Sequence, residues 1–168
     1  MTMGRLLLTA ALLAAPGFAA AQEPAGCAAF KWPIERERAA LAAATKPVVV
    51  NGGALRYGAA QTLELEPFTE GSLPHAPERA PKGASSFAGH FTLGAPMKPG
   101  LYKVTLASDG WIDLIDSGAF LHPKGFSGAA GCEGVRKSVK FDLPGRPLDV
   151  QLSNVKDAEI AVIVTPLE

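Results

Sequence analysis

Short runs in which apolar and polar residues alternate fill the chain from Phe87 onward. A period of two places successive side chains on opposite faces of an extended strand, whereas a surface helix needs a period near 3.6. Glycine, proline and aspartate, which favour turns, separate these runs. The runs are SFAGHFTL, LYKVTLAS, WIDLID, VRKSVKFDL, PLDVQLS and EIAVIVTP. With the shorter runs before them they make about eight or nine strands, which predicts a mainly β fold, an antiparallel β-sandwich of the jelly-roll type.

The part of the chain before Phe87 predicts one short helix and one long irregular segment. WPIERERAALAAAT, residues 32–45, spaces its apolar residues at about the helical period, with Pro33 suited to the first turn. We expect the charged ERER to form the solvent-facing side of this helix. Residues 67–84 contain four prolines and scattered charges, which prevent a regular hydrogen-bond ladder. We interpret this proline-rich loop as an extended crossover or a flexible flap, and a loop of this length is a candidate for function.

The first 21 residues have the pattern of a secretory signal peptide. A short positive region is followed by the apolar stretch LLLTAALLAA and by small residues at 19 and 21. We expect cleavage after Ala21, export to the periplasm or the medium, and residues 22–168 as a single β-sandwich domain without a membrane span. The 16 basic and 16 acidic residues balance, which argues against nucleic acid as a partner.

Two cysteines, Cys27 and Cys132, are present. An oxidising compartment allows paired cysteines to persist, so export predicts a disulfide between them. The long spacing and the lack of a Cys-x-x-Cys motif argue against a redox pair. Lipidation of Cys27 is a less favoured alternative, because Pro24 stands where a lipoprotein signal has an aliphatic residue.

The stretch LYKVTLASDGWIDLIDSG, residues 101–118, holds the strongest turn signal of the chain, the Asp-Gly pair at 109–110. This pair between two alternating runs predicts a β-hairpin. On its second strand Trp111 and Asp113 share one face, and we expect Asp113 to face solvent rather than bind a cation. Trp111, Asp113 and Tyr102 are the candidate binding residues.

The histidines and one serine are the candidates for chemistry. His75, His90 and His122 lack the local spacing of a zinc or copper motif, so we interpret them as surface residues. If they converge in the fold, His90 and His122 are the first candidates for a metal; no cofactor is expected. GFSGA, residues 125–129, is close to a nucleophile elbow at Ser127, but no helix follows, so we interpret it as a glycine-rich loop that brings Cys132 to Cys27.

Several strand patterns between residues 91 and 166 together resemble a known family. GLYKVTL, IDLIDSG and the closing runs VKFDLPG, LDVQLS and IAVIVTP resemble the bacterial pre-peptidase C-terminal domain, a jelly-roll-type sandwich. The resemblance implies a secreted, non-catalytic module. The sequence departs from that pattern, because it carries no attached enzyme and adds a helix, a cysteine pair and the proline-rich loop.

Together these features predict an exported binding or accessory protein that is not an enzyme. Its partner would be a protein or small molecule that binds loops held on a rigid frame. Two alternatives remain open: the handling of a metal or small molecule, and a serine hydrolase that uses Ser127.

Overall fold

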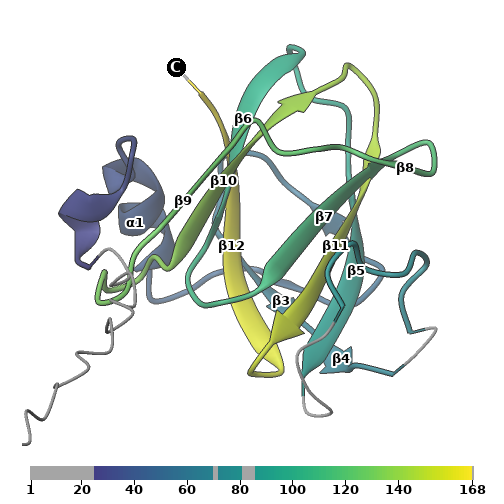
Figure 1. Cartoon of the computed structure of the whole chain (residues 1–168), viewed down its shortest axis with the longest axis horizontal. Helices are drawn as coiled ribbons and strands as arrows, with labels where there is room; N and C mark the ends of the chain where they lie inside the picture. The colour runs from purple at the N-terminus through teal and green to yellow at the C-terminus, as the bar shows by residue number, and fades with distance from the viewer. Residues whose placement is uncertain (1–24, 70–71, 81–85, 168) are drawn as a thin grey trace, which may run out of the picture.

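A computed structural model describes residues 25–69, 72–80 and 86–167. The signal peptide expected over residues 1–21 lies outside these residues, as do parts of the proline-rich loop. Two sheets of mostly antiparallel strands pack face to face (Figure 1). Two short pairings, Val48–Val49 with residues 62–63 and Ala54–Leu55 with residues 92–93, are parallel. No helix in the described part of the chain is long and apolar enough to span a membrane.

The strands divide between the two sheets as follows. The first sheet runs in the order β1 (Val48–Val49), β3 (Gln61–Glu64), β12 (Glu159–Pro166), β6 (Gly100–Leu106), β10 (Lys137–Leu143) and β9 (Gly125–Gly128). The second runs in the order β2 (Ala54–Leu55), β5 (Phe87–Leu93), β11 (Leu148–Val155), β7 (Trp111–Asp116) and β8 (Ala119–Phe120), with β4 (Glu66–Pro67) also paired to β5.

The strand pairing is nested in the manner of a jelly roll. The pair β3–β12 encloses β5–β11 along the chain, which encloses β6–β10, and these pairs alternate between the sheets. The innermost pair, β7–β8, lies in the second sheet. The predicted jelly-roll sandwich with one short helix is therefore confirmed.

The core lies between the sheets and follows strand parity. Alternate residues of β5, β6, β10 and β11 point inward, among them Phe91, Val104, Phe141 and Leu152, all buried. The alternation read from the sequence therefore places these side chains on the correct face. In the second half of the chain only the two shortest strands, β8 and β9, were not expected; β9 occupies the stretch interpreted as a glycine-rich loop.

The hairpin predicted at 109–110 is wrong. The strands on either side of this Asp-Gly pair, β6 and β7, belong to different sheets, so the connection crosses between the layers. Gly110 leaves little room for a side chain, because a Cβ there would lie 3.0 Å from Cγ2 of Val155. The two-residue hairpin occurs instead at Ser117 and Gly118, whose φ angles of 52° and 85° suit a tight turn between β7 and β8.

An N-terminal segment covers the outer face of the first sheet. It comprises the 3₁₀ turn η1 (Cys27–Ala29) and the helix α1 (Glu35–Leu41), which is shorter than predicted and begins two residues after Pro33. Ile34 and Leu41 pack with Val135 and Ile163 in a second apolar cluster. The predicted Cys27–Cys132 disulfide is confirmed, with the two Cα atoms 4.6 Å apart.

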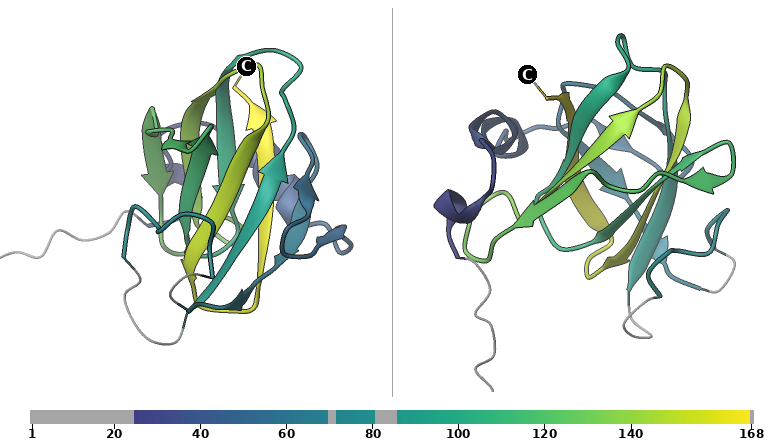
Figure 2. Two further views of the ribbon diagram at one scale, coloured as in Figure 1. Left: turned by 90° about the vertical axis from the view of Figure 1, so that its right-hand side faces the viewer. Right: turned by 45° about the horizontal axis from the view of Figure 1, so that its top comes forward.

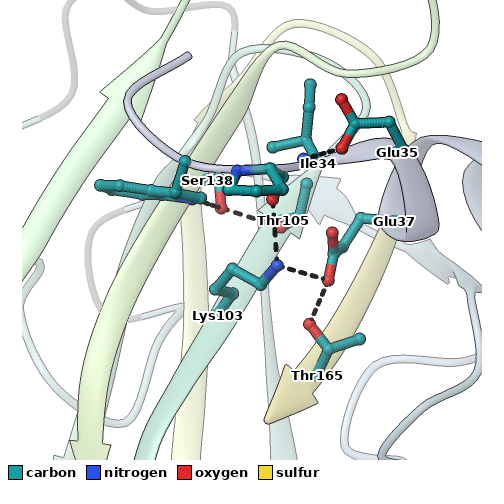
Figure 3. A network of polar contacts seen from close by, with 9 residues as sticks. Ile34, Glu35, Glu37, Lys103, Thr105, Ser138 and Thr165 are labelled. Atoms are coloured by element: carbon teal, nitrogen blue, oxygen red, sulfur yellow. Dashed lines mark hydrogen bonds and ion pairs between the residues drawn. The ribbon is translucent and has the colours of Figure 1, made fainter. Parts of the chain in front are cut away.

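Glu37 joins α1 to the first sheet and corrects the prediction of a solvated ERER face. Its side chain is 1% exposed, with Oε1 2.9 Å from Nζ of Lys103 and 2.5 Å from Oγ1 of Thr165 (Figure 3). Burial raises the pKa of Glu37, but the hydrogen bonds from Thr165 and Lys103 outweigh this and hold it below its ordinary value. The alternation could not reveal this, because Lys103 and Thr165, the strand residues that contact Glu37, are polar.

Residues 72–80 of the proline-rich loop cover the outer face of the second sheet, on the side of the molecule opposite α1 (Figure 2). Gln151 of β11 is buried and binds the backbone of His75 twice, accepting from N at 2.9 Å and donating to O at 3.0 Å. Asp113 of β7 accepts a hydrogen bond from the backbone N of Glu78. This part of the loop is therefore docked on the sheet.

Candidate functional site

A cleft surrounds Trp111 at one edge of the sandwich. Two hollows adjoin there, and Arg79, Trp111, Phe126 and Lys137 line both of them. We call these four residues and the two hollows the Trp111 cleft. They come from residues 72–80, β7, β9 and β10, so the cleft forms where both sheets and the docked loop meet.

The cleft exists because strand pairing stops early at this edge. The short strand β8 pairs only with Ile115 and Asp116 of β7, and one further bond joins the N of Leu121 to the O of Leu114. On that side, residues 111–113 of β7 have no strand partner in the described part of the chain. The gap between the two layers is therefore open beside Trp111.

Asp113 holds the Trp111 ring in place. Nε1 of Trp111 donates to Oδ1 of Asp113 at 2.7 Å, so the prediction that these side chains share one face holds. The prediction that Asp113 faces solvent is wrong: it is 3% exposed, because residues 72–80 cover this face of the sheet. Burial raises the pKa of Asp113, opposed in part by the hydrogen bonds from Trp111 and the Glu78 backbone.

Cationic side chains surround the ring. The Arg79 guanidinium carbon lies 5.3 Å and Lys137 Nζ 5.8 Å from the centroid of the ring, both within cation–π range. Lys137 also donates to the carbonyl oxygen of Gly110 and lies 5.8 Å from the Phe126 ring. We call the hollow that Asp109 and Arg136 also line the outer hollow, and the other the inner hollow. In the outer hollow Nε of Arg136 lies 3.1 Å from Oδ2 of Asp109.

The inner hollow is an apolar cavity of about 320 Å³ that reaches toward the core. This is within the usual range for small-molecule pockets. Trp111 lines this hollow, as does Phe126, which is 51% exposed. Its other apolar lining residues are Ile112, Leu121, Pro123, Val139 and Phe141.

The remaining candidate binding residue, Tyr102, is not part of this cleft. It is buried between the sheets, with its ring 5.3 Å from that of Tyr57. Its hydroxyl donates to the Lys98 carbonyl oxygen at 2.9 Å. Tyr102 is thus a core residue, as its position in phase with Val104 on β6 requires.

The histidines occupy different environments. His122 is exposed, with Nδ1 3.7 Å from a Glu78 carboxylate oxygen. His90 is half-buried rather than on the surface, and its ring Nδ1 has no hydrogen-bond partner in the described structure. The ring of His75 lies edge-on to that of Phe120, with the two ring centroids 6.3 Å apart. Across residues 25–69, 72–80 and 86–167, no three His, Cys, Asp or Glu side chains are grouped to hold a metal.

Ser127 lies within β9 rather than on a turn between a strand and a helix. It is buried, and its hydroxyl oxygen accepts a hydrogen bond from the backbone N of Lys31 at 2.9 Å. In this position the hydroxyl attaches the N-terminal segment to the edge of the first sheet.

Sequence reasoning found Trp111 as a candidate but did not place Arg79, Phe126 and Lys137 beside it. Arg79 comes from the proline-rich loop, which was singled out only as a segment. Phe126 of β9 pairs with Val139 of β10, two residues from Lys137 and on the same face, and a strand prediction for GFSG is the signal that would have joined them.

Comparisons with known proteins returned no match: no protein-family model matches the chain, and neither a curated protein nor a solved structure matches it.

Proposed function

We propose that this chain is an exported, non-catalytic binding protein whose ligand occupies the Trp111 cleft. Export is supported by the signal-peptide pattern and by the disulfide, which is typical of oxidising compartments. A binding role agrees with the resemblance to a secreted non-catalytic module. The engagement of Ser127 in a backbone hydrogen bond makes it a structural rather than a nucleophilic residue.

One observation carries the proposal: an apolar cavity opens beside a tryptophan that the fold holds rigidly. Binding sites for small molecules are mostly apolar and concave, with a few placed polar groups. The Trp111 cleft meets this description, because its inner hollow is apolar, Asp113 accepts a hydrogen bond from the Trp111 ring, and Arg79 and Lys137 lie near that ring. A fixed aromatic side chain loses little entropy when a ligand binds.

The proposal is tested with N-phenyl-1-naphthylamine, a neutral apolar dye that fluoresces when it leaves water. The oxidised protein should bind one dye molecule. Val139→Phe fills the inner hollow, and Phe126→Ala removes an exposed ring that lines both hollows. Each substitution should weaken dye binding by about tenfold or more, the effect of one lost apolar anchor.

Leu101→Ala is the matched control, because Leu101 is 40% exposed on β6 and does not line the cleft. It should leave dye binding unchanged. Thermal unfolding of each variant verifies that the fold is retained. The proposal is overturned if the native protein binds no dye, or if Phe126→Ala and Val139→Phe both bind it as the native protein does.

A further inference from the structure

Resting on the proposed function, we infer that the ligand of the Trp111 cleft is an anionic amphiphile. The cleft joins two different environments, an apolar cavity and a cationic outer hollow, and Trp111 lines both of them. A molecule with an apolar chain or ring and a carboxylate, sulfate or phosphate head matches both. The head would lie at Arg79 and Lys137, and the apolar part would lie among Ile112, Val139 and Phe141.

The charge of the cleft favours a negative head group. Among the residues that the structure describes, Arg79, Arg136 and Lys137 line the outer hollow together with one carboxylate, that of Asp109. That carboxylate is 3.1 Å from Arg136, so its charge is already offset. At the inner hollow the described lining holds Arg79, Lys137 and a single acidic residue, Glu78, which lies beside His122. Within the described part of the chain, each hollow thus has more cationic than anionic side chains.

The apolar lining of the inner hollow favours a ligand that carries an apolar group in addition to its anionic head. Five apolar side chains line the inner hollow beyond Trp111 and Phe126, and they belong to both sheets and to the crossing between β8 and β9. A bare phosphate or sulfate would leave this surface in contact with water. An apolar group that fills the hollow removes that surface from water, which contributes about 25 cal/mol for each Å² buried.

The experiment compares three ligands with one ten-carbon chain, each displacing the dye from the oxidised protein: decanoate, decanol and decyltrimethylammonium. Decanoate should bind about tenfold more tightly than decanol, and the cation should bind most weakly. Higher salt concentration should weaken decanoate binding and leave decanol binding unchanged, because salt screens only the charged contact. Arg79→Gln and Lys137→Gln should reduce the preference for decanoate over decanol. Lys98→Gln, which removes an exposed lysine outside the cleft, should retain it.

The outcomes separate this inference from the function it rests on. If the dye binds but decanol binds as tightly as decanoate, the cleft remains a binding site and the anionic class is wrong. If decanoate is preferred but neither Arg79→Gln nor Lys137→Gln alters the preference, the assignment of the head group to these cations is wrong. If the native protein binds neither dye nor any of the three ligands, the proposed function itself is overturned.

Discussion

At the scale of the residue, the most consequential side chain outside the cleft is Glu37. It is a carboxylate placed almost completely out of water between α1 and the first sheet, with Lys103 as its counter-ion. Lys103 Nζ also donates to the Pro33 carbonyl oxygen at 3.2 Å. Removing one member of such a buried pair leaves the other charged group without compensation, which costs far more than an exposed pair contributes.

Glu37→Gln should lower the free energy of unfolding at pH 7 by about 3 kcal/mol. Because the pKa of Glu37 is lowered in the folded state, its contribution is present above the ordinary pKa of 4.5 and is lost as the pH falls through the folded value. The difference between native and variant should therefore shrink below that pH. Urea unfolding at pH 7 and in acid measures it.

Glu35→Gln provides the control, since Glu35 is an exposed residue of the same helix. Its effect on the free energy of unfolding should be small, typical of a surface substitution. Equal stability of the native protein and Glu37→Gln at pH 7 would contradict the role assigned to this ion pair.

Strand alternation predicts correctly which side chains share a face of a strand, but it does not predict whether that face is exposed to solvent. Strand alternation correctly paired Trp111 with Asp113, but it could not tell that Asp113 is covered. The reason is physical: alternation separates the face toward the core from the opposite face, and in this protein both opposite faces are partly covered by chain from distant segments. Glu37, Asp113 and Gln151 are buried at such places.

At the scale of the element, residues 72–80 behave as a layer docked on the second sheet. Proline prevents this segment from pairing as a strand, so its backbone groups need side-chain partners. Gln151 supplies two of these contacts and Asp113 a third. The same segment places Arg79 over Trp111, so the docking of the loop also completes the cleft.

Gln151→Leu should loosen this segment, because the backbone N and O of His75 lose their partner. Limited proteolysis with trypsin, which cleaves after arginine, should then cut after Arg79 several-fold faster than in the native protein. Asp149→Asn is the control: it alters an exposed residue two positions earlier on β11, on the same face. A cleavage rate at Arg79 that is unchanged in Gln151→Leu would show that the segment is held by other contacts.

The turn at Asp109 and Gly110 crosses between the two sheets although its local sequence predicts a hairpin. An Asp-Gly pair between alternating runs favours a tight hairpin, but a jelly roll passes successive strands between sheets. What decides the outcome is the pairing of β6 with β10 and β12, strands that come much later in the chain. A local pattern holds no information about that long-range choice.

At the scale of the whole molecule, the disulfide ties the N-terminal segment to the loop after β9. Cys27 and Cys132 are separated by 105 residues, so the bond closes most of the described chain into one loop. Loops of this length restrict the unfolded state strongly in the chain-entropy model. Gly26 N donates to Ala130 O at 2.7 Å beside it, so the backbone supports the same junction.

Replacing both cysteines with serine should lower the free energy of unfolding by roughly 2 to 5 kcal/mol. Urea unfolding of the double variant, compared with the native protein before and after reduction, measures this loss. The reduced native protein should match the double variant. If the two oxidation states of the native protein unfold at the same urea concentration, the bridge contributes nothing to stability.

The position of β12 in the first sheet affects when the chain can complete its folding during synthesis. This strand lies between β3 and β6, which come much earlier in the chain, so an internal place in the sheet stays vacant until residues 159–166 have been synthesised. Pairing between such distant parts of a chain makes folding slow. Slow folding keeps a nascent chain extended for longer, which is the form in which a polypeptide can be threaded through a translocation channel.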